Sequence, residues 1–191
     1  MPSDWKLPDE RSGVLFRLCV IGYDSLRWGF ELNLKGYYIQ SFALVRQGWE
    51  SWLHGAYLHL YPEREVSEWR DFRSRPKPSQ MRKAVADRSS ADGSINEDFR
   101  AALNDLADTY AALAHPTEDA VSATIALKGD ELWVLRGGAF DRARFLRTVN
   151  LLSLTANLLA SLIWILLPEE RAYYDEGQAM SAELAKWGVT G

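Results

Sequence analysis

Three titratable residues, Arg46, Glu50 and His54, follow one another at four-residue spacing in one stretch of the chain. Residues four apart on a helix share a face, so Glu50 can pair with Arg46 and accept a hydrogen bond from His54. One interpretation is a salt bridge at the boundary of the core that orders the fold. The other is a polar pocket in which Arg46 binds an anion and the carboxylate tunes the histidine.

A further candidate, His115, stands at the end of a predicted helix in the stretch Tyr110-Ala-Ala-Leu-Ala-His-Pro116. The C-terminus of a helix favours a cationic imidazole, so this position can hold a proton. In one interpretation His115 caps its helix before the proline stops it. In the other it is a site histidine that faces Arg46 and Glu50 across the fold.

Both helices that carry these residues have an apolar stripe, at positions 38, 42, 45, 49, 52 and 56 of one and at 99, 103, 106, 110 and 113 of the other. Because both stripes must be buried, we expect the two helices to face each other. A charged pair at the edge of a core also needs partners. We therefore predict one polar pocket, with His115, Arg46 and Glu50 as candidate catalytic residues and His54 and Tyr110 as candidate ligand-binding residues.

The sequence has no glycine-rich phosphate loop, no Cys/His spacing typical of metal sites and no nucleophile elbow. His54 and His59 are five residues apart, which is poor spacing for two ligands on one helical face. The sequence therefore predicts no metal and no cofactor.

Basic residues concentrate in one segment. Two acidic residues, Asp71 and Asp87, stand there against seven basic ones: Arg70, Arg73, Arg75, Lys77, Arg82, Lys83 and Arg88. Two prolines interrupt any helix at 76–78, so we expect a flexible basic loop at about 73–94. The segment Arg70–Arg88 is either a solvated loop or a binding site for RNA, since Arg and Lys neutralise phosphate charge.

Apolar periodicity predicts five or six helices. They cover Val14–Leu32, Tyr38–Tyr61, Glu65–Phe72, Phe99–Leu113 and Phe140–Leu167, and a last one begins at Pro168. Residues 121–135 carry β-branched side chains around a Lys-Gly-Asp turn, which is typical of a small β-hairpin. Because amphipathic helices need partners, we predict a mainly α, up-and-down helical bundle in a single domain, 1–191.

The composition fits this fold, since 47% of the 191 residues are hydrophobic. A net charge of −4 gives no global attraction to nucleic acid or to an anionic membrane. The single cysteine, Cys19, cannot form an intramolecular disulfide, and the N-terminus lacks the basic and apolar regions of a signal peptide. We expect a cytoplasmic protein.

The stretch Leu151–Leu167 is strongly apolar and ends at Pro168. Its length matches the shortest helices that span a membrane, which need roughly 17–25 residues. The alternative is a helix buried at the centre of the bundle, which is apolar all round in the same way. We favour the central buried helix and predict no membrane association.

Two segments together resemble a known group of proteins. These are Ala43-Leu-Val-Arg-Gln-Gly-Trp-Glu50, and Leu106-Ala-Asp-Thr-Tyr-Ala-Ala-Leu-Ala-His-Pro116 followed by a hairpin and a long apolar helix. The pattern is similar to uncharacterised bacterial helical proteins akin to the HEPN superfamily, and it covers roughly residues 14–167. The resemblance implies a helical bundle that is often dimeric. Many HEPN proteins are ribonucleases of toxin–antitoxin or phage-defence systems.

Catalytic HEPN proteins carry an arginine followed by a histidine after four to six residues, whereas seven residues separate Arg46 from His54 here. We therefore expect a non-catalytic module that binds a partner, a nucleic acid or a small ligand and forms a homodimer. The alternative is a metal-independent ribonuclease. There His115 would move the 2′-hydroxyl proton, Arg46 would stabilise the phosphorane charge and Glu50 would orient them.

Overall fold

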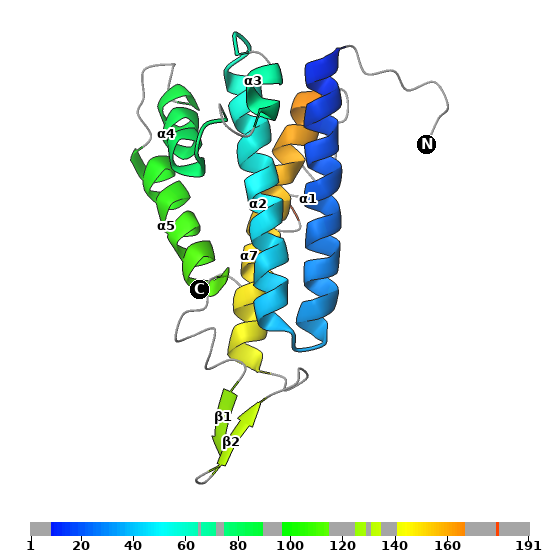
Figure 1. The fold of residues 1–191 in the computed structure, drawn as a ribbon, viewed down its shortest axis with the longest axis vertical. Helices are drawn as coiled ribbons and strands as arrows, with labels where there is room; N and C mark the ends of the chain where they lie inside the picture. Colours follow the sequence, from blue (N-terminus) through cyan, green and yellow to red (C-terminus); the bar gives the residue numbers. More distant parts are fainter. Residues whose placement is uncertain are drawn as a thin grey trace, which may run out of the picture.

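The fold is a helical bundle, as the sequence predicts, and it is seen here in a computed structural model. The structure describes residues 9–64, 66–71, 75–89, 97–114, 125–128, 131–134, 141–166 and 179. The described helices are α1 (Glu10–Leu34), α2 (Tyr38–Leu60), α3 (Val66–Arg70), α4 (Pro78–Ser89), α5 (Glu97–Ala114) and α7 (Arg142–Leu166). Figure 1 shows α1, α2 and α7 as three long neighbours, with α4 and α5 on the other side of α2.

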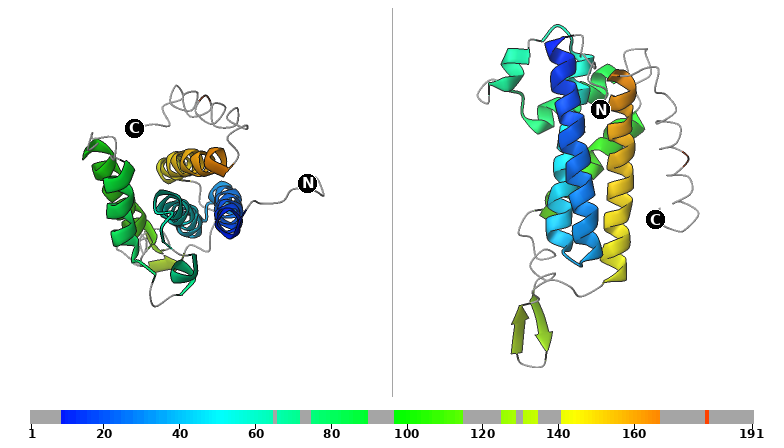
Figure 2. Two further views of the ribbon diagram at one scale, coloured as in Figure 1. Left: turned by 90° about the horizontal axis from the view of Figure 1, so that it is seen from above. Right: turned by 90° about the vertical axis from the view of Figure 1, so that its right-hand side faces the viewer.

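The central helix of the described structure is α2, which contacts α1, α4, α5 and α7. Seen from above, α1, α2 and α7 form a triangle, and α4 and α5 lie outside it next to α2 (Figure 2). Buried residues therefore occupy most of the circumference of α2. The prediction that the helix of Leu151–Leu167 is central is wrong, because α7 buries one stripe and leaves Leu154 exposed on another side.

Local interactions set the ends of α1 and α2. The carboxylate of Asp9 accepts a hydrogen bond of 2.7 Å from the backbone N–H of Ser12 and so caps the start of α1. Gly36 adopts a φ of 76°, in the left-handed region that favours glycine, and this closes the short turn into α2. At the far end of α2, the Arg11 guanidinium donates to the backbone carbonyls of Leu58 and Pro62 and satisfies groups that a helix end leaves unpaired.

The helix α4 lies inside the range 73–94, where the sequence predicts a flexible loop, so that prediction is wrong for residues 78–89. Pro78 does not interrupt a helix but occupies its first position, where the missing N–H costs nothing. The Gln80 side chain accepts a hydrogen bond of 2.9 Å from the N–H of Lys77, as in a capping box. Met81 and Val85, one turn apart, are buried against the bundle and hold α4 in place.

A two-stranded antiparallel ladder joins β1 (Ile125–Lys128) to β2 (Glu131–Val134). Lys128 is paired with Glu131 next to the turn, and Ile125 is paired with Val134 at the open end. In Figure 1 the two strands lie beyond the lower end of the bundle. They therefore add nothing visible to the helical core.

Among the described residues, one helical segment, Arg142–Ile163 in α7, has the length and composition to cross a membrane, and 33% of its most apolar window is buried. Core helices of soluble bundles have the same composition. The absence of membrane association stays a prediction.

Close packing between helices depends on two glycines. A Cβ added to Gly55 of α2 would lie 2.5 Å from Cδ1 of Leu162, and one added to Gly22 of α1 would lie 2.6 Å from Cδ2 of Leu159. Both leucines belong to α7 and are buried. The two glycines therefore let α7 approach α1 and α2 closely.

We expect Gly55→Ala to lower the free energy of unfolding by up to about 2 kcal/mol. Overpacking costs about 1–3 kcal/mol and outweighs the gain in helix propensity, which is about 1 kcal/mol. The matched control is Gly13→Ala, because a Cβ there meets nothing within 4 Å. Urea denaturation should show the control equal to or more stable than the wild type, and a stabilised Gly55→Ala protein would contradict the close contact.

Candidate functional site

Arg46 and Glu50 form an ion pair on α2. The Nε of Arg46 donates a hydrogen bond of 2.8 Å to Oε1 of Glu50, and about a third of each side chain is exposed. The pairing that the spacing predicts is therefore confirmed. Because the pair lies within one helix and is open to water, it adds little stability by itself. The carboxylate of Glu50 offsets the positive charge of Arg46 and occupies part of the guanidinium that could otherwise bind an anion.

His54, one turn further along α2, lies mostly inside the protein. Burial is the main cause that lowers the pKa of His54 from 6.5 to about 4, and the nearby positive charge of Arg75 lowers it further. His54 is therefore neutral at pH 7. A neutral imidazole can accept or donate a hydrogen bond but does not offer a positive charge to an anion. The predicted hydrogen bond from His54 to Glu50 stays a prediction.

Tyr110 of α5 lies in the core, with 1% of its surface exposed. Its hydroxyl lies 2.5 Å from Oγ1 of Thr155 on α7, and its ring packs against Trp49 of α2 at a centroid distance of 5.4 Å. Burial raises the pKa of Tyr110, so its hydroxyl stays protonated at neutral pH. Tyr110 thus ties α5 to α2 and α7, and the structure gives it a direct role in packing.

We expect Tyr110→Phe and Thr155→Val each to lower the free energy of unfolding by about 1–2 kcal/mol. Each substitution removes one hydroxyl and leaves the other buried without its hydrogen-bond partner, which costs about this much. The double variant should lose less than the two losses added, since both remove the same hydrogen bond. Chemical denaturation of the four proteins measures this coupling. Strictly additive losses would show that the two hydroxyls do not interact.

His115 lies outside the described residues, as do Pro116 and the side chain of Leu113. The structure therefore brings Arg46, Glu50 and His54 together on α2 and places Tyr110 on the neighbouring α5. The pocket shared by Arg46, Glu50 and His115 stays a prediction.

Two basic residues of the segment 70–88 pair with acids elsewhere in the chain. The Arg70 guanidinium pairs with Glu10 of α1. The Arg88 guanidinium pairs with Glu63 at 2.6 Å and lies over the ring of Tyr61, 4.6 Å from its centroid. These contacts pin α3 and α4 to the ends of α1 and α2. They also offset part of the positive charge that the sequence offers to RNA.

The described residues include no group of three or more His, Cys, Asp or Glu side chains placed to hold a metal ion. Cys19 is buried, which raises the pKa of its thiol to about 11 and makes it a poor nucleophile and metal ligand. The prediction that the protein binds no metal stays a prediction.

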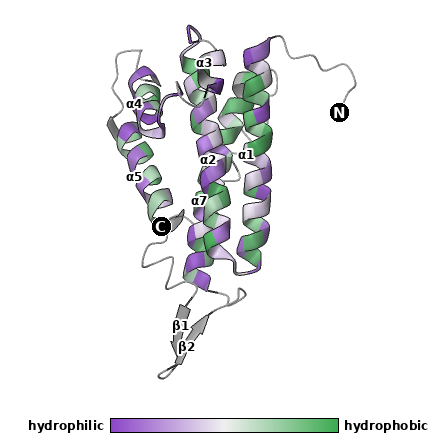
Figure 3. Cartoon of the chain, viewed as in Figure 1, coloured by the Kyte–Doolittle hydropathy of each residue, from purple (hydrophilic) through white to green (hydrophobic). Residues whose placement is uncertain are grey.

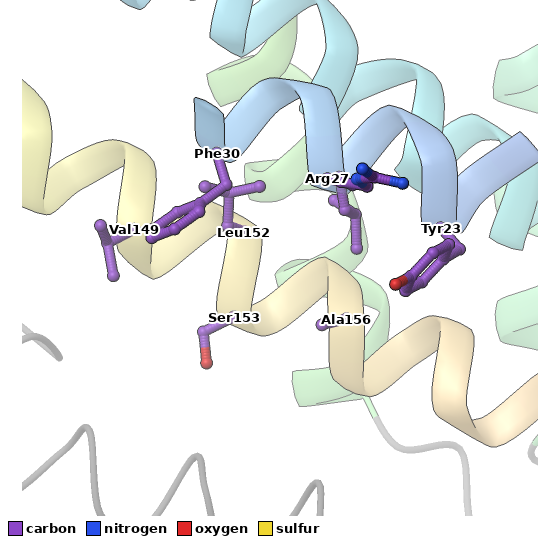
Figure 4. A pocket seen from close by; sticks show the side chains of 8 residues that line it. Tyr23, Arg27, Phe30, Val149, Leu152, Ser153 and Ala156 are labelled. Atoms are coloured by element: carbon purple, nitrogen blue, oxygen red, sulfur yellow. The ribbon is translucent and has the colours of Figure 1, made fainter. Parts of the chain in front are cut away.

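A feature that the sequence analysis missed lies between α1 and α7, where a groove of about 450 Å³ opens on the surface. Its walls are almost entirely apolar. Figure 4 shows side chains of the two helices facing this space. The lining residues are Tyr23, Leu26, Arg27 and Phe30 of α1 and Val149, Leu152, Ser153 and Ala156 of α7.

Hydrophobic residues recur along α1 (Figure 3), and several of the large ones have exposed side chains. Phe30 is 45% exposed and Tyr23 is 64% exposed. The buried side of α1 carries Val14, Leu15 and Leu18 in its first half and small residues, Gly22, Ser25 and Gly29, in its second half. The signal in the sequence lies in this second half, where small residues line the buried side while large apolar residues fall elsewhere.

Comparisons of the chain with family models, with curated proteins and with solved structures find no match.

Proposed function

We propose that the protein is a non-catalytic interaction module that binds another protein chain through the exposed apolar side of α1. The observation that carries this proposal is the distribution of exposed large hydrophobic residues. Of the eight in the described structure, six lie on α1, and four of these recur at helical spacing on one side of it: Val20, Tyr23, Phe30 and Leu34. Apolar residues scattered singly need no explanation, whereas a concentration on one helix beside an apolar groove marks a surface for binding.

Arg46, Glu50 and His54 form the polar strip of α2, and their surroundings support a structural role for it. Arg46 is held by Glu50, and His54 is neutral and mostly buried at pH 7. General acid–base catalysis needs a histidine that can exchange a proton near the operating pH. His54 does not meet this requirement. Ribonuclease action with Arg46 and His115 is the alternative, and in it His115 has to be the residue that exchanges the proton.

RNA binding through the segment Arg70–Arg88 is a further outcome to test. The ion pairs of Arg70 with Glu10 and of Arg88 with Glu63 would have to compete with RNA phosphates. Phosphate contacts make binding steeply dependent on salt, so a weak, salt-sensitive association is the most that this segment supports.

Photo-crosslinking tests the proposal. Benzoylphenylalanine placed at Phe30 in the full chain should give a discrete crosslinked band with a protein in the cells that express it. The same probe at Asp105, an exposed position on α5, is the matched control and should give none. No band from Phe30 would contradict binding through α1.

Catalysis is tested separately with the purified protein and a labelled RNA in the presence of a metal chelator. We expect no cleavage by the wild type. Cleavage that is lost in His115→Ala, with an unchanged melting temperature, would favour the ribonuclease instead.

A further inference from the structure

The exposed residues Val20, Tyr23, Arg27, Phe30 and Leu34, here called the α1 seam, are spaced alternately by three and four positions along α1. This spacing averages 3.5 residues and is the a/d pattern of a helix that packs against another helix in a coiled coil. The four apolar members are 40–64% exposed. The α1 seam is therefore a packing surface that faces solvent in the described structure.

The groove beside the α1 seam has the form of a seat for a helix. Tyr23, Leu26, Arg27 and Phe30 line it from α1, and four α7 residues line it with the same i, i+3, i+4, i+7 spacing. Two helices that each present such a stripe bind the apolar side of a third. Figure 4 shows the two stripes on either side of the space.

We propose that this seat is filled by α1 of a second copy of the chain, which runs antiparallel to the first α1 in a two-fold symmetric dimer. The proposal rests on the proposed function, because it names the partner that the exposed side of α1 binds. It places the interface on the α1 seam and the α7 wall of the groove.

The α1 seam is complementary to itself when it is reversed. A two-fold axis near residues 28–29 sets Tyr23 opposite Leu34 of the second copy and Arg27 opposite its Phe30. A two-fold contact requires this reciprocity, since residue i meets j and residue j meets i. Each large aromatic side chain then meets an aliphatic or a cationic partner.

Charge decides between the antiparallel and the parallel arrangement. In the antiparallel one, Arg27 lies over the Phe30 ring of the second copy, a favourable cation–π geometry, and beside its Glu31. Within one chain Arg27 already lies 4.0 Å from Glu31, and both are well exposed. A parallel alignment in register would instead set Arg27 against Arg27, and like charges in a seam repel.

The same charges argue against a membrane as the occupant. Asp24 and Glu31 border the α1 seam on the exposed side of α1, and the chain carries a net charge of −4. Carboxylates beside an apolar surface disfavour anionic lipid headgroups, whereas a second copy supplies an arginine for each Glu31.

Sedimentation equilibrium of the purified full chain, from 1 to 100 µM, tests the dimer. We expect twice the chain mass for the wild type. Phe30→Glu should raise the dissociation constant by about 30-fold or more, because it removes an apolar contact near the two-fold axis. The matched control is Leu154→Glu, which changes a large exposed side chain of α7 that does not line the groove and should leave the dimer intact. Circular dichroism confirms that each variant keeps its helices.

Cysteine pairing tests the orientation without disturbing the apolar contacts at the axis. A mixture of Tyr23→Cys and Leu34→Cys proteins, treated with a short bis-maleimide, should form the mixed crosslinked dimer. Either variant alone should crosslink poorly, because antiparallel copies hold identical positions apart. Cys19 does not compete, since it is buried.

Three results would overturn the proposal: a monomeric wild type at 100 µM, a Phe30→Glu protein that dimerises as well as the wild type, or efficient crosslinking of Tyr23→Cys to itself. A monomer that still crosslinks from Phe30 to a different protein in cells would leave the proposed function standing and exclude the second copy. A monomer that floats with phosphatidylglycerol vesicles, and gives no crosslinked protein, would exclude both.

Discussion

Leu159→Glu is expected to unfold the bundle or to lower its free energy of unfolding by about 4 kcal/mol or more. Leu159 lies in the core with 5% of its surface exposed, and its methyl groups face Gly22 of α1. A carboxylate at this position would be buried without a partner, which costs several kcal/mol, and the packing of the leucine would be lost as well. Domains of this size have only about 5–15 kcal/mol of stability in total.

Leu154→Glu is the matched control for this change, since it lies on the same helix and is 45% exposed. Glutamate is a good helix former, so we expect the control to stay within about 0.5 kcal/mol of the wild type. Circular dichroism and urea denaturation compare the two variants directly. A folded Leu159→Glu protein with wild-type stability would show that α7 does not pack against α1 as described.

Periodicity was enough to predict the long helices. The stripe of α2 at Tyr38, Phe42, Val45 and Trp49 is buried in the structure, because a 3.6-residue period reports one face of a helix reliably. The boundary at Tyr61 also agrees with the structure to within one residue, since the residue before a proline avoids the helical region. An apolar stripe that continues over several helical turns is therefore enough to assign a helix.

Pro76 and Pro78 are the reason why the sequence predicts a loop where residues 78–89 form a helix. A proline ends a helix when it falls inside one but favours a helix when it falls at the first position, and the sequence alone does not say which applies. The signal that decides is the capping pattern, with Gln80 three residues after Lys77 and a buried pair at Met81 and Val85. That pattern is short, and the surrounding basic residues obscure it.

Contacts between segments far apart in the chain could not be predicted from the sequence. The pair of Arg46 and Glu50 follows from spacing on one helix, so the sequence predicts it. The contact of Tyr110 with Thr155 joins residues 45 positions apart, and the effect of Arg75 on His54 joins two separate elements. Such contacts depend on how the helices pack, which periodicity does not specify. This is why the surroundings of the candidate site became clear only from the structure.

The α1 helix shows a different limit. A helix with one stripe can be assigned from its pattern, but the second half of α1 has a buried side of small residues and an exposed side with large apolar ones. In this half the large apolar residues do not mark the buried side, because Gly22, Ser25 and Gly29 are buried although they contribute little hydrophobicity. The exposed stripe is what makes this helix a candidate for binding rather than for packing within one chain.

The stability of the protein should fall by about 3 kcal/mol between pH 7 and pH 4 because of His54 alone. Burial lowers the pKa of His54 to about 4 in the folded state, whereas its pKa is near 6.5 when the chain is unfolded. Between these values the unfolded chain binds the extra proton, so the free energy of unfolding decreases as the pH falls through this window. Each pKa unit of difference corresponds to about 1.4 kcal/mol.

Urea denaturation at pH 7, 6, 5 and 4 measures this dependence in the wild type and in His54→Gln. The substitution removes the titrating group, so the stability of the variant should change with pH by about 3 kcal/mol less than that of the wild type. The matched control, His59→Gln, removes a more exposed histidine of the same helix whose pKa is also lowered by burial, and we expect a smaller change there because its desolvation is smaller. Equal pH profiles for the wild type and His54→Gln would mean that the pKa of His54 is the same in the folded and the unfolded chain, and therefore that burial does not lower it.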